Sequence, residues 1–298
     1  MKFSLTNEFR EDLKIAIENK DVKFIKSSFE GSSPADITEL LYEFDSVQSK
    51  YVVDNIDLET ASKIISELDE DTRQIFLTHF GSTEIAKYLE IIDSDDGADI
   101  LSELSPKVRN ETILSITDKE KSKNLKDLLQ YDDDVAGGLM AKELVKCNIN
   151  WKINQCIDLI KKQAEKVSRI YSVYVTDNKG ELLGKVSLKD IIVASDNSRI
   201  KDIYDDYVIS VDSKMNQEEV AIIMQKYDLD VLPVINKRGK LLGRITIDDV
   251  VDVITETAEE ERQIMSGITS DVEEDDSIWK LSNARLPWLV IGIFGGLF

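Results

Sequence analysis

The residues best suited to chemistry in this chain are carboxylates that recur along one predicted helix. Asp249, Asp252, Glu256 and Glu260 follow one another at intervals of three and four residues, so a helix would present them on one side. Like charges at these spacings destabilise a helix by about 0.2–0.5 kcal/mol per pair. A solvated acidic face accounts for such a stripe in the simplest case, and a bound cation accounts for it if other carboxylates face it.

Other acidic clusters lie far from this stripe in the sequence. Asp95 and Asp99 belong to the segment SDDGAD, a run of three aspartates ends at Asp134, and Glu218 and Asp228 belong to the repeated part of the chain. Acidic faces that fold against one another repel, and a hard divalent cation between them relieves the repulsion. The chemistry indicated is cation binding where two parts of the chain meet.

The overall charge of the chain is strongly negative, at −21 over 298 residues, and this favours cations as ligands. It argues against nucleic acid as a partner, because phosphate binding needs a concentrated basic surface. Cys147 and Cys156 are nine residues apart and the sole histidine is His79, which fits neither a zinc site nor a disulfide framework. The first residues contain no hydrophobic signal segment, so a reducing, cytosolic environment is expected.

No arrangement of residues indicates catalysis. The chain has one histidine, no glycine-rich phosphate loop and no Ser/His/Asp series, and its carboxylates lie on predicted helices rather than at strand ends. A protein that is not an enzyme is therefore expected.

A segment that occurs twice organises the second half of the chain. Residues 172–192 recur 59 positions later as residues 231–251, with a Leu-Leu-Gly run and a following Asp in register. Each copy reads as a β-hairpin followed by a helix, and an amphipathic helix precedes each, at 154–164 and 216–227. The sequence therefore predicts two β-α-β-β-α units of about 60 residues that pack against each other.

The first 130 residues contain almost no strand signals and read as ten short helices. Acidic residues able to cap helices recur every 24 residues, at Asp45, Asp69 and Asp93, which indicates a stack of helix pairs. The segment YDDDVAGGLM at 131–140 then predicts a hinge. The fold class expected is a multidomain α+β protein: an all-α superhelical repeat, the two β-α-β-β-α units and a long connecting helix.

The segment 286–298 contains no charged residue. A membrane span needs about 20 apolar residues, so this segment would be an incomplete span. Lys280 and Arg285 precede it, and Trp279 and Trp288 lie at the expected interfacial depth. The pattern predicts the start of a transmembrane helix, and the alternative is a buried C-terminal core helix.

The two units carry paired motifs of the form G-h-h-[ST]-x-x-D. They are Gly184-Lys-Val-Ser187-Leu-Lys-Asp190 and Gly243-Arg-Ile-Thr246-Ile-Asp-Asp249. This part of the chain resembles a tandem pair of CBS (cystathionine-β-synthase) domains. The resemblance implies a sensor attached to an enzyme or a transporter, and many such pairs bind adenine nucleotides.

The order of the segments resembles the cytosolic part of MgtE-type magnesium transporters along essentially the whole chain. The most specific pieces are YDDDVAGGLM, NQEEV, YDLDVLPV, TIDDVVDVI and ARLPWLVI. The resemblance implies a homodimer on the cytoplasmic face of the cell membrane, in which Mg²⁺ at the domain interfaces closes the pore. The pore would belong to transmembrane helices of the same protein. The implied parts are a helical N-domain at 1–130, CBS domain 1 with the hinge at 131–200, CBS domain 2 at 201–257, a connecting or plug helix at 258–285, and the start of the first transmembrane helix at 286–298.

The resemblance also implies which residues bind Mg²⁺. Asp95 and Asp99 would face Asp249 and Asp252, and Mg²⁺ suits sites of one or two carboxylates because it keeps several of its waters. Ca²⁺ would require six to eight ligands, and the sequence has no EF-hand loop. The remaining implied ligands are Asp134, the carbonyl of Gly137, Glu218, Asp228, Glu256 and Glu260. Asn216 and Thr257 stand where the family often has acids, so a site near them is expected to be weaker.

A nucleotide-sensing CBS module of a membrane transporter is the alternative function. As in many CBS pairs, Asp190 and Asp249 would bind ribose hydroxyls of ATP or another adenine nucleotide, and Ser187 and Thr246 would contact phosphate. The other interpretation is that Ser187 and Thr246 only cap helices. Because both functions use Asp249, nucleotide and Mg²⁺ would affect each other's binding reciprocally.

Overall fold

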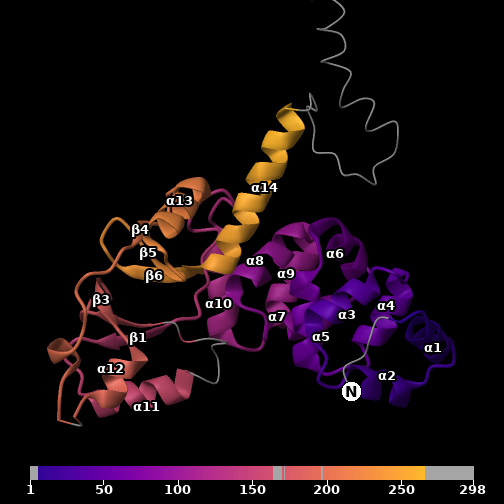
Figure 1. The fold of residues 1–298 in the computed structure, drawn as a ribbon, viewed down its shortest axis with the longest axis horizontal. Helices are drawn as coiled ribbons and strands as arrows, with labels where there is room; N and C mark the ends of the chain where they lie inside the picture. Colours follow the sequence, from indigo (N-terminus) through magenta and orange to yellow (C-terminus); the bar gives the residue numbers. More distant parts are fainter. Residues whose placement is uncertain (1–5, 164–169, 171, 196, 266–298) are drawn as a thin grey trace, which may run out of the picture.

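The computed structural model describes residues 6–163, 170, 172–195 and 197–265, and its N-terminal part is helical (Figure 1). We call residues 6–130 the N-domain. The ten helices expected from the sequence are present there. They are α1 (Asn7–Glu18), α2 (Val22–Phe29), α3 (Pro34–Leu41), α4 (Ser46–Val53), α5 (Leu58–Glu67), α6 (Glu70–Leu77), α7 (Ser82–Leu89), α8 (Ser94–Glu103), α9 (Pro106–Ser115) and α10 (Lys119–Leu128).

Aspartates begin many of these helices, as the 24-residue spacing predicted. Asp45 accepts hydrogen bonds from the first turn of α4, and Asp69 does so for α6. Asp93 occupies the same position before α8, but its side chain makes no such bond. Instead its Oδ2 accepts a hydrogen bond from Nη2 of Arg244, 3.3 Å away and 151 residues later in the chain. The repeat is therefore altered where the N-domain meets the second half of the protein.

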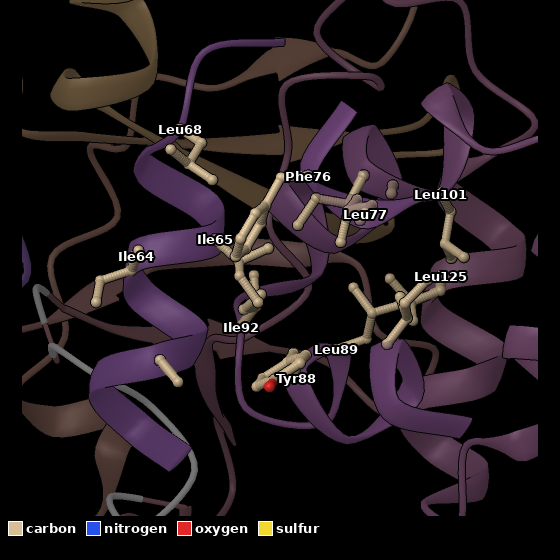
Figure 2. Packing of buried hydrophobic residues seen from close by; sticks show 14 of the residues in the cluster. Ile64, Ile65, Leu68, Phe76, Leu77, Tyr88, Leu89, Ile92, Leu101 and Leu125 are labelled. Carbon is tan, nitrogen blue, oxygen red and sulfur yellow. The ribbon is translucent and has the colours of Figure 1, made fainter. Parts of the chain in front are cut away.

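The N-domain core is built from apolar side chains on the inner faces of paired helices. Figure 2 shows Ile64 and Ile65 of α5, Leu89 of α7, Leu101 of α8 and Leu125 of α10 among them. Helix α8 packs closely on α10, because a Cβ atom at Gly97 would lie only 2.9 Å from Cδ2 of Leu125. This contact fixes the position of α8, which carries the SDDGAD carboxylates.

The two predicted β-α-β-β-α units are confirmed. In each sheet the first strand pairs in parallel with the second, and the second pairs antiparallel with the third. The tips of the two hairpins join the units, since Leu182 N donates to the Gly239 carbonyl at 2.9 Å and Leu241 N donates to the Gly180 carbonyl at 3.0 Å. The first unit contains β1 (Val145–Asn148), α11 (Ile153–Gln163), β2 (Val173–Thr176), β3 (Leu182–Val186), α12 (Leu188–Val193) and a 3-10 helix (Ile200–Asp202); the second contains β4 (Val211–Asp212), α13 (Gln217–Tyr227), β5 (Val231–Ile235), β6 (Leu241–Thr246) and α14 (Ile247–Met265).

The segment after the N-domain is bonded to the second unit, although the first unit follows it in sequence. Ala136 N donates to the Met215 carbonyl at 2.8 Å, and Gln217 N donates to the Asp134 carbonyl at 2.9 Å. Ala141 exchanges two backbone hydrogen bonds with Arg244, at 2.8 and 2.9 Å. The sequence predicted a hinge across 131–140, but residues 134–141 are fixed by these bonds. Any pivot between the domains therefore lies before Asp134.

Helix α14 continues from the second unit as one uninterrupted helix that projects away from the rest of the molecule (Figure 1). The boundary expected at residue 257 thus falls inside α14. The part of the expected connecting helix that follows residue 265 and the apolar segment 286–298 lie outside the described residues. Within the described part of the chain, no helix is both long enough and apolar enough to cross a membrane.

Candidate cation-binding site

A cleft of about 1160 Å³ lies between the N-domain and the second unit. The N-domain contributes the end of α5, the start of α6 and one side of α8 along its length. The opposite wall comes from β6, the start of α14 and the segment that follows the N-domain. Thirteen carboxylate side chains and only two arginines line the cleft: Glu67, Asp69, Glu70, Asp93, Asp95, Asp96, Asp99, Glu103, Asp133, Asp134, Asp248, Asp249 and Asp252, with Arg73 and Arg244.

The carboxylates of α8 are positioned by the helix itself. Asp95 and Asp96 lie in its first turn, where the helix dipole favours negative charge, and Asp99 follows on the next turn. One oxygen of Asp95, Oδ1, is buried and has no hydrogen-bond partner among the described residues. A buried carboxylate oxygen without a partner is costly, so this atom fits a bound cation.

The opposite wall is built by the second G-h-h-[ST]-x-x-D motif. A single oxygen of Asp249, Oδ2, accepts hydrogen bonds from Thr246 N and Thr246 Oγ1, both at 2.8 Å. Its other oxygen takes no part in this cap. Asp248 and Asp252 lie one residue before and three residues after it on α14, and both also line the cleft. The motif therefore both caps α14 and presents carboxylates to α8.

Burial and mutual repulsion raise the pKa values of these carboxyl groups. The pKa of Asp96 rises to about 7 through burial and then the charge of Asp249. The pKa of Asp99 also rises to about 7 through burial and then the charge of Asp133, although both side chains keep contact with water in the cleft. Burial is also the largest cause for Asp249, whose pKa rises to about 6. Burial and then the charges of Asp96 and Asp249 raise the pKa of Asp95 well above its usual value. The cleft thus has an excess of negative charge that costs free energy at neutral pH.

The two arginines of the cleft already have partners. Arg73 binds both carboxylate oxygens of Glu103 and donates to the carbonyls of Ser66 and Leu68, each at 3.0 Å. Arg244 donates to the Glu143 carbonyl at 2.7 Å and to Asp93. Each guanidinium fixes neighbouring segments in place. Most of the carboxylates on α8 and α14 therefore lack a cationic side chain of their own in the described structure.

Five of the ten predicted cation ligands meet in this cleft: Asp95, Asp99, Asp134, Asp249 and Asp252. Gly137 does not line it. Its N–H donates to the Ser213 carbonyl, and the ring of Tyr131 lies where a Cβ atom would be, at 2.1 Å. The neighbouring Gly138 lines the cleft instead.

The other predicted ligands lie elsewhere. Glu218 and Asp228 are exposed at the two ends of α13, where Asp228 ends the helix in the left-handed conformation with φ of 52°. Glu256 and Glu260 continue along α14, but their side chains lie outside the described part. Sequence reasoning missed Asp133 and Asp248 as site residues, although each adjoins a predicted ligand. It also missed Glu67, Asp69, Glu70 and Glu103, whose position on the cleft wall depends on how the helices stack.

The chemistry of the cleft fits Mg²⁺ better than a cation that needs a full protein shell. Among the described residues, no three carboxylate, histidine or cysteine side chains form a ready-made metal site. Mg²⁺ commonly binds through one or two carboxylates and retains several waters, whereas Ca²⁺ takes six to eight oxygen ligands. Asp95, with its unpartnered Oδ1, and Asp249, with one oxygen outside the cap, are the residues that would hold such an ion.

A smaller cavity of about 170 Å³ lies between the two units. Three tyrosines and a lysine contribute to its lining, namely Tyr174, Tyr207, Tyr227 and Lys185. The hydroxyl of Tyr174 is buried without a hydrogen-bond partner in the described structure. Aromatic faces and a lysine suit a planar base and a phosphate.

The residues predicted for nucleotide binding lie outside this cavity. Ser187 Oγ donates to Asp190 Oδ2 at 2.6 Å and caps α12, so this pair performs the capping role that was the alternative interpretation. Thr246 and Asp249 line the acidic cleft.

Two domain families match this chain. Residues 32–134 match the family described as "MgtE intracellular N domain", and residues 135–197 and 200–256 match the CBS domain. A helical domain of this kind followed by a CBS pair is the regulatory arrangement of a transporter family. The solved cytosolic domain of the Mg²⁺ channel MgtE in complex with ATP is 30% identical to this chain. It has a TM-score of 0.76, over 82% of this chain and 99% of that one.

The chain belongs to the MgtE family. It is 32% identical to the magnesium transporter MgtE of Enterococcus faecalis over 256 residues, which is 77% of this chain and 56% of that protein. It is 29% identical to the magnesium transporter MgtE of Thermus thermophilus over 289 residues, which is 96% of this chain and 64% of that protein. The chain therefore spans less than two thirds of the length of these relatives.

Proposed function

We propose that this chain is the Mg²⁺-sensing and gating region of a magnesium transporter or channel, on the cytoplasmic face of the membrane. The observation that carries the proposal is the buried, unpartnered Oδ1 of Asp95 in a cleft of thirteen carboxylates. Without a divalent cation, α8 and the start of α14 repel each other. With Mg²⁺ bound between them, the N-domain and the second unit are held together.

Switching the chain from the open to the compact arrangement requires more than one bound ion. Inverting a population from 1:99 to 99:1 takes a difference in binding free energy of about 5.5 kcal/mol. A water-rich site of one or two carboxylates supplies less than this, so several ions act together and the response is cooperative. The arrangement of α14, which begins in the cleft and projects away from both domains, suits it to carry this change toward a pore domain.

A homodimer is part of the proposal. Apolar side chains are exposed on the helices of both units, with Ile192 and Val193 of α12 at 78% and 77%, Ile222 of α13 at 61% and Val251 of α14 at 51%. Val250 of α14, in contrast, is buried in the core of the second unit. A second copy of the chain would remove the exposed set from water.

The test is the radius of gyration of the 298-residue chain, measured by small-angle X-ray scattering during titration with MgCl₂. NaCl keeps the ionic strength constant at every point. We expect cooperative compaction with MgCl₂ and none with NaCl alone. Equal compaction by NaCl would mean that charge screening explains the effect, and the specific-site proposal would then be wrong.

Adenine-nucleotide sensing is the second candidate function, and the tyrosine-lined cavity favours it. A nucleotide there would stack its base on an aromatic ring and give Tyr174 Oη a hydrogen-bond partner. The relative solved with ATP bound supports the same chemistry. Calorimetric titration with ATP and AMP, on the wild type and on Tyr174→Phe, tests it. We expect weaker ATP binding in the variant, and no binding to the wild type would exclude this function.

A further inference from the structure

Glu143 is a buried carboxylate at the junction of the domains that lies outside the cleft. Its Oε2 accepts hydrogen bonds from Ser94 N at 3.0 Å and Ser94 Oγ at 2.6 Å. Its Oε1 forms an ion pair with Lys121 Nζ at 2.9 Å, where the two side chains are only 13% and 9% exposed. Lys121 also donates to the Ile92 carbonyl just before α8. The side chain of Glu143 is thus bonded wholly to the N-domain.

The backbone around Glu143 belongs to the second unit. Its carbonyl accepts a hydrogen bond from Arg244 Nε at 2.7 Å, and Ala141 pairs with Arg244 through two backbone hydrogen bonds. Arg244 lies on β6, two residues before Thr246 and five before Asp249. Glu143 therefore connects the strand that leads to the α14 carboxylates with the N-domain.

Ser94 places this connection directly beside the cleft. It is fully buried, it is the first residue of α8, and Asp95 follows it. The Lys142 N–H also donates to Ser94 Oγ at 2.8 Å. The start of α8 is consequently held to the second unit by attractive bonds, at the point where its carboxylates face those of α14.

We propose that Glu143 is a positioning residue that sets the Mg²⁺ concentration of the response. Its buried ion pair and hydrogen bonds offset part of the carboxylate repulsion, so the separation of α8 and α14 stays within the range that hydrated Mg²⁺ can bridge. The proposal rests on the function proposed above. Glu143 thus binds no ion itself, but it determines the Mg²⁺ concentration at which half of the compaction has occurred.

Glu143→Gln tests this inference, because glutamine keeps the shape and an acceptor oxygen but removes the charge. In the MgCl₂ titration of the radius of gyration we expect the midpoint to rise by about threefold or more, since a buried ion pair is broken. The steepness should stay unchanged, because no ligand is lost. Asp127→Asn is the matched control: it breaks the Lys142–Asp127 pair at the same junction, where Asp127 is 52% exposed, and the midpoint should move by less than about 1.5-fold.

Folding is controlled by a double variant. Glu143→Gln combined with Lys121→Met leaves neither charge unpaired, so it should keep the N-domain folded if Glu143→Gln alone does not. Thermal unfolding followed by circular dichroism checks each variant. If the two residues act as a pair, the Mg²⁺ midpoint of the double variant is no higher than the higher of the midpoints of the two single variants, Glu143→Gln and Lys121→Met.

The outcomes separate the two proposals. A Glu143→Gln titration that matches the wild type overturns this inference, and so does a lower steepness, which would make Glu143 a ligand. If the wild type shows no response to Mg²⁺, the proposed function fails. The positioning role of Glu143 is then decided by the radius of gyration without Mg²⁺, which must be larger in Glu143→Gln than in Asp127→Asn.

Discussion

Asp249→Asn should have opposite effects on the compact form of the chain with and without Mg²⁺: it should stabilise the compact form in the absence of divalent cation and weaken its stabilisation by Mg²⁺. One asparagine oxygen can replace Oδ2 of Asp249 and accept both hydrogen bonds from Thr246, so the cap of α14 survives. The substitution removes a negative charge that raises the pKa values of Asp95 and Asp96. We therefore expect a more compact chain in the absence of divalent cation and a weaker response to Mg²⁺.

The magnitude follows from the pKa of Asp249, which rises from its usual 3.8 to about 6. At 1.36 kcal/mol per pKa unit this is about 3 kcal/mol, chiefly from burial. Because the side chain is partly exposed, screening reduces the free energy by which the substitution favours the compact state to about 1 kcal/mol. Loss of a charge-assisted interaction with the hydrated ion costs about 1.5–3 kcal/mol. The net loss of about 0.5–2 kcal/mol raises the Mg²⁺ midpoint roughly twofold to thirtyfold.

The assay is the scattering titration with MgCl₂ at constant ionic strength. Asp190→Asn is the matched control, because Asp190 occupies the same motif position in the first unit and accepts a hydrogen bond from Ser187, the N-cap of α12, but does not line the cleft. It should behave as the wild type. Equal midpoints for Asp249→Asn and Asp190→Asn would refute the assignment of Asp249 as a ligand. An Asp249→Asn chain that is less compact without Mg²⁺ would refute the repulsion argument.

Three further predictions concern pH, assembly and stability. The raised pKa values of Asp96 and Asp99, about 7, mean that the compact arrangement binds protons more tightly than the open one; its stability is therefore lost as the pH rises through 7. Without Mg²⁺ the radius of gyration should be small at pH 5.5 and large at pH 8, and a flat profile would contradict this. Ile222→Asp should convert a dimer into the 33.8 kDa monomer in sedimentation experiments, and a monomeric wild type would exclude the proposed interface. Gly137→Ala should lower the free energy of unfolding by about 1–3 kcal/mol because Tyr131 occupies the space, whereas Gly81→Ala, with its nearest contact at 3.6 Å, should be close to neutral in thermal unfolding.

Local signals predicted the elements of this fold well. The Asn178–Gly180 and Lys237–Gly239 turns have glycine at positive φ, 83° and 73°, and each connects the two hairpin strands that the repeat predicted. Helix starts at Asp45 and Asp69 were equally clear, because capping depends on three or four neighbouring residues.

Contacts between distant segments were not predictable in the same way. Nothing in the sequence of 134–141 shows that it pairs with residues 213–217 and 244 rather than with the unit that follows it. The resemblance implied that the Gly137 carbonyl is a ligand, but Gly137 is buried beneath Tyr131 and does not line the cleft. The cavity between the units was missed for the same cause: Tyr174 and Tyr227 are 53 residues apart and approach only when the two sheets join.

The pairing of 134–141 with the second unit has a consequence for synthesis of the protein. The N-domain can fold once its ten helices have left the ribosome, but its docking surface on β6 and α14 is made about 100 residues later. At about 5–20 residues per second, roughly 5–20 s pass before Arg244 and Asp249 emerge. During this interval Ala141 lacks its partner Arg244, and the acidic face of α8 is open to solvent. The high density of carboxylates there would keep the waiting nascent chain soluble until the second unit arrives.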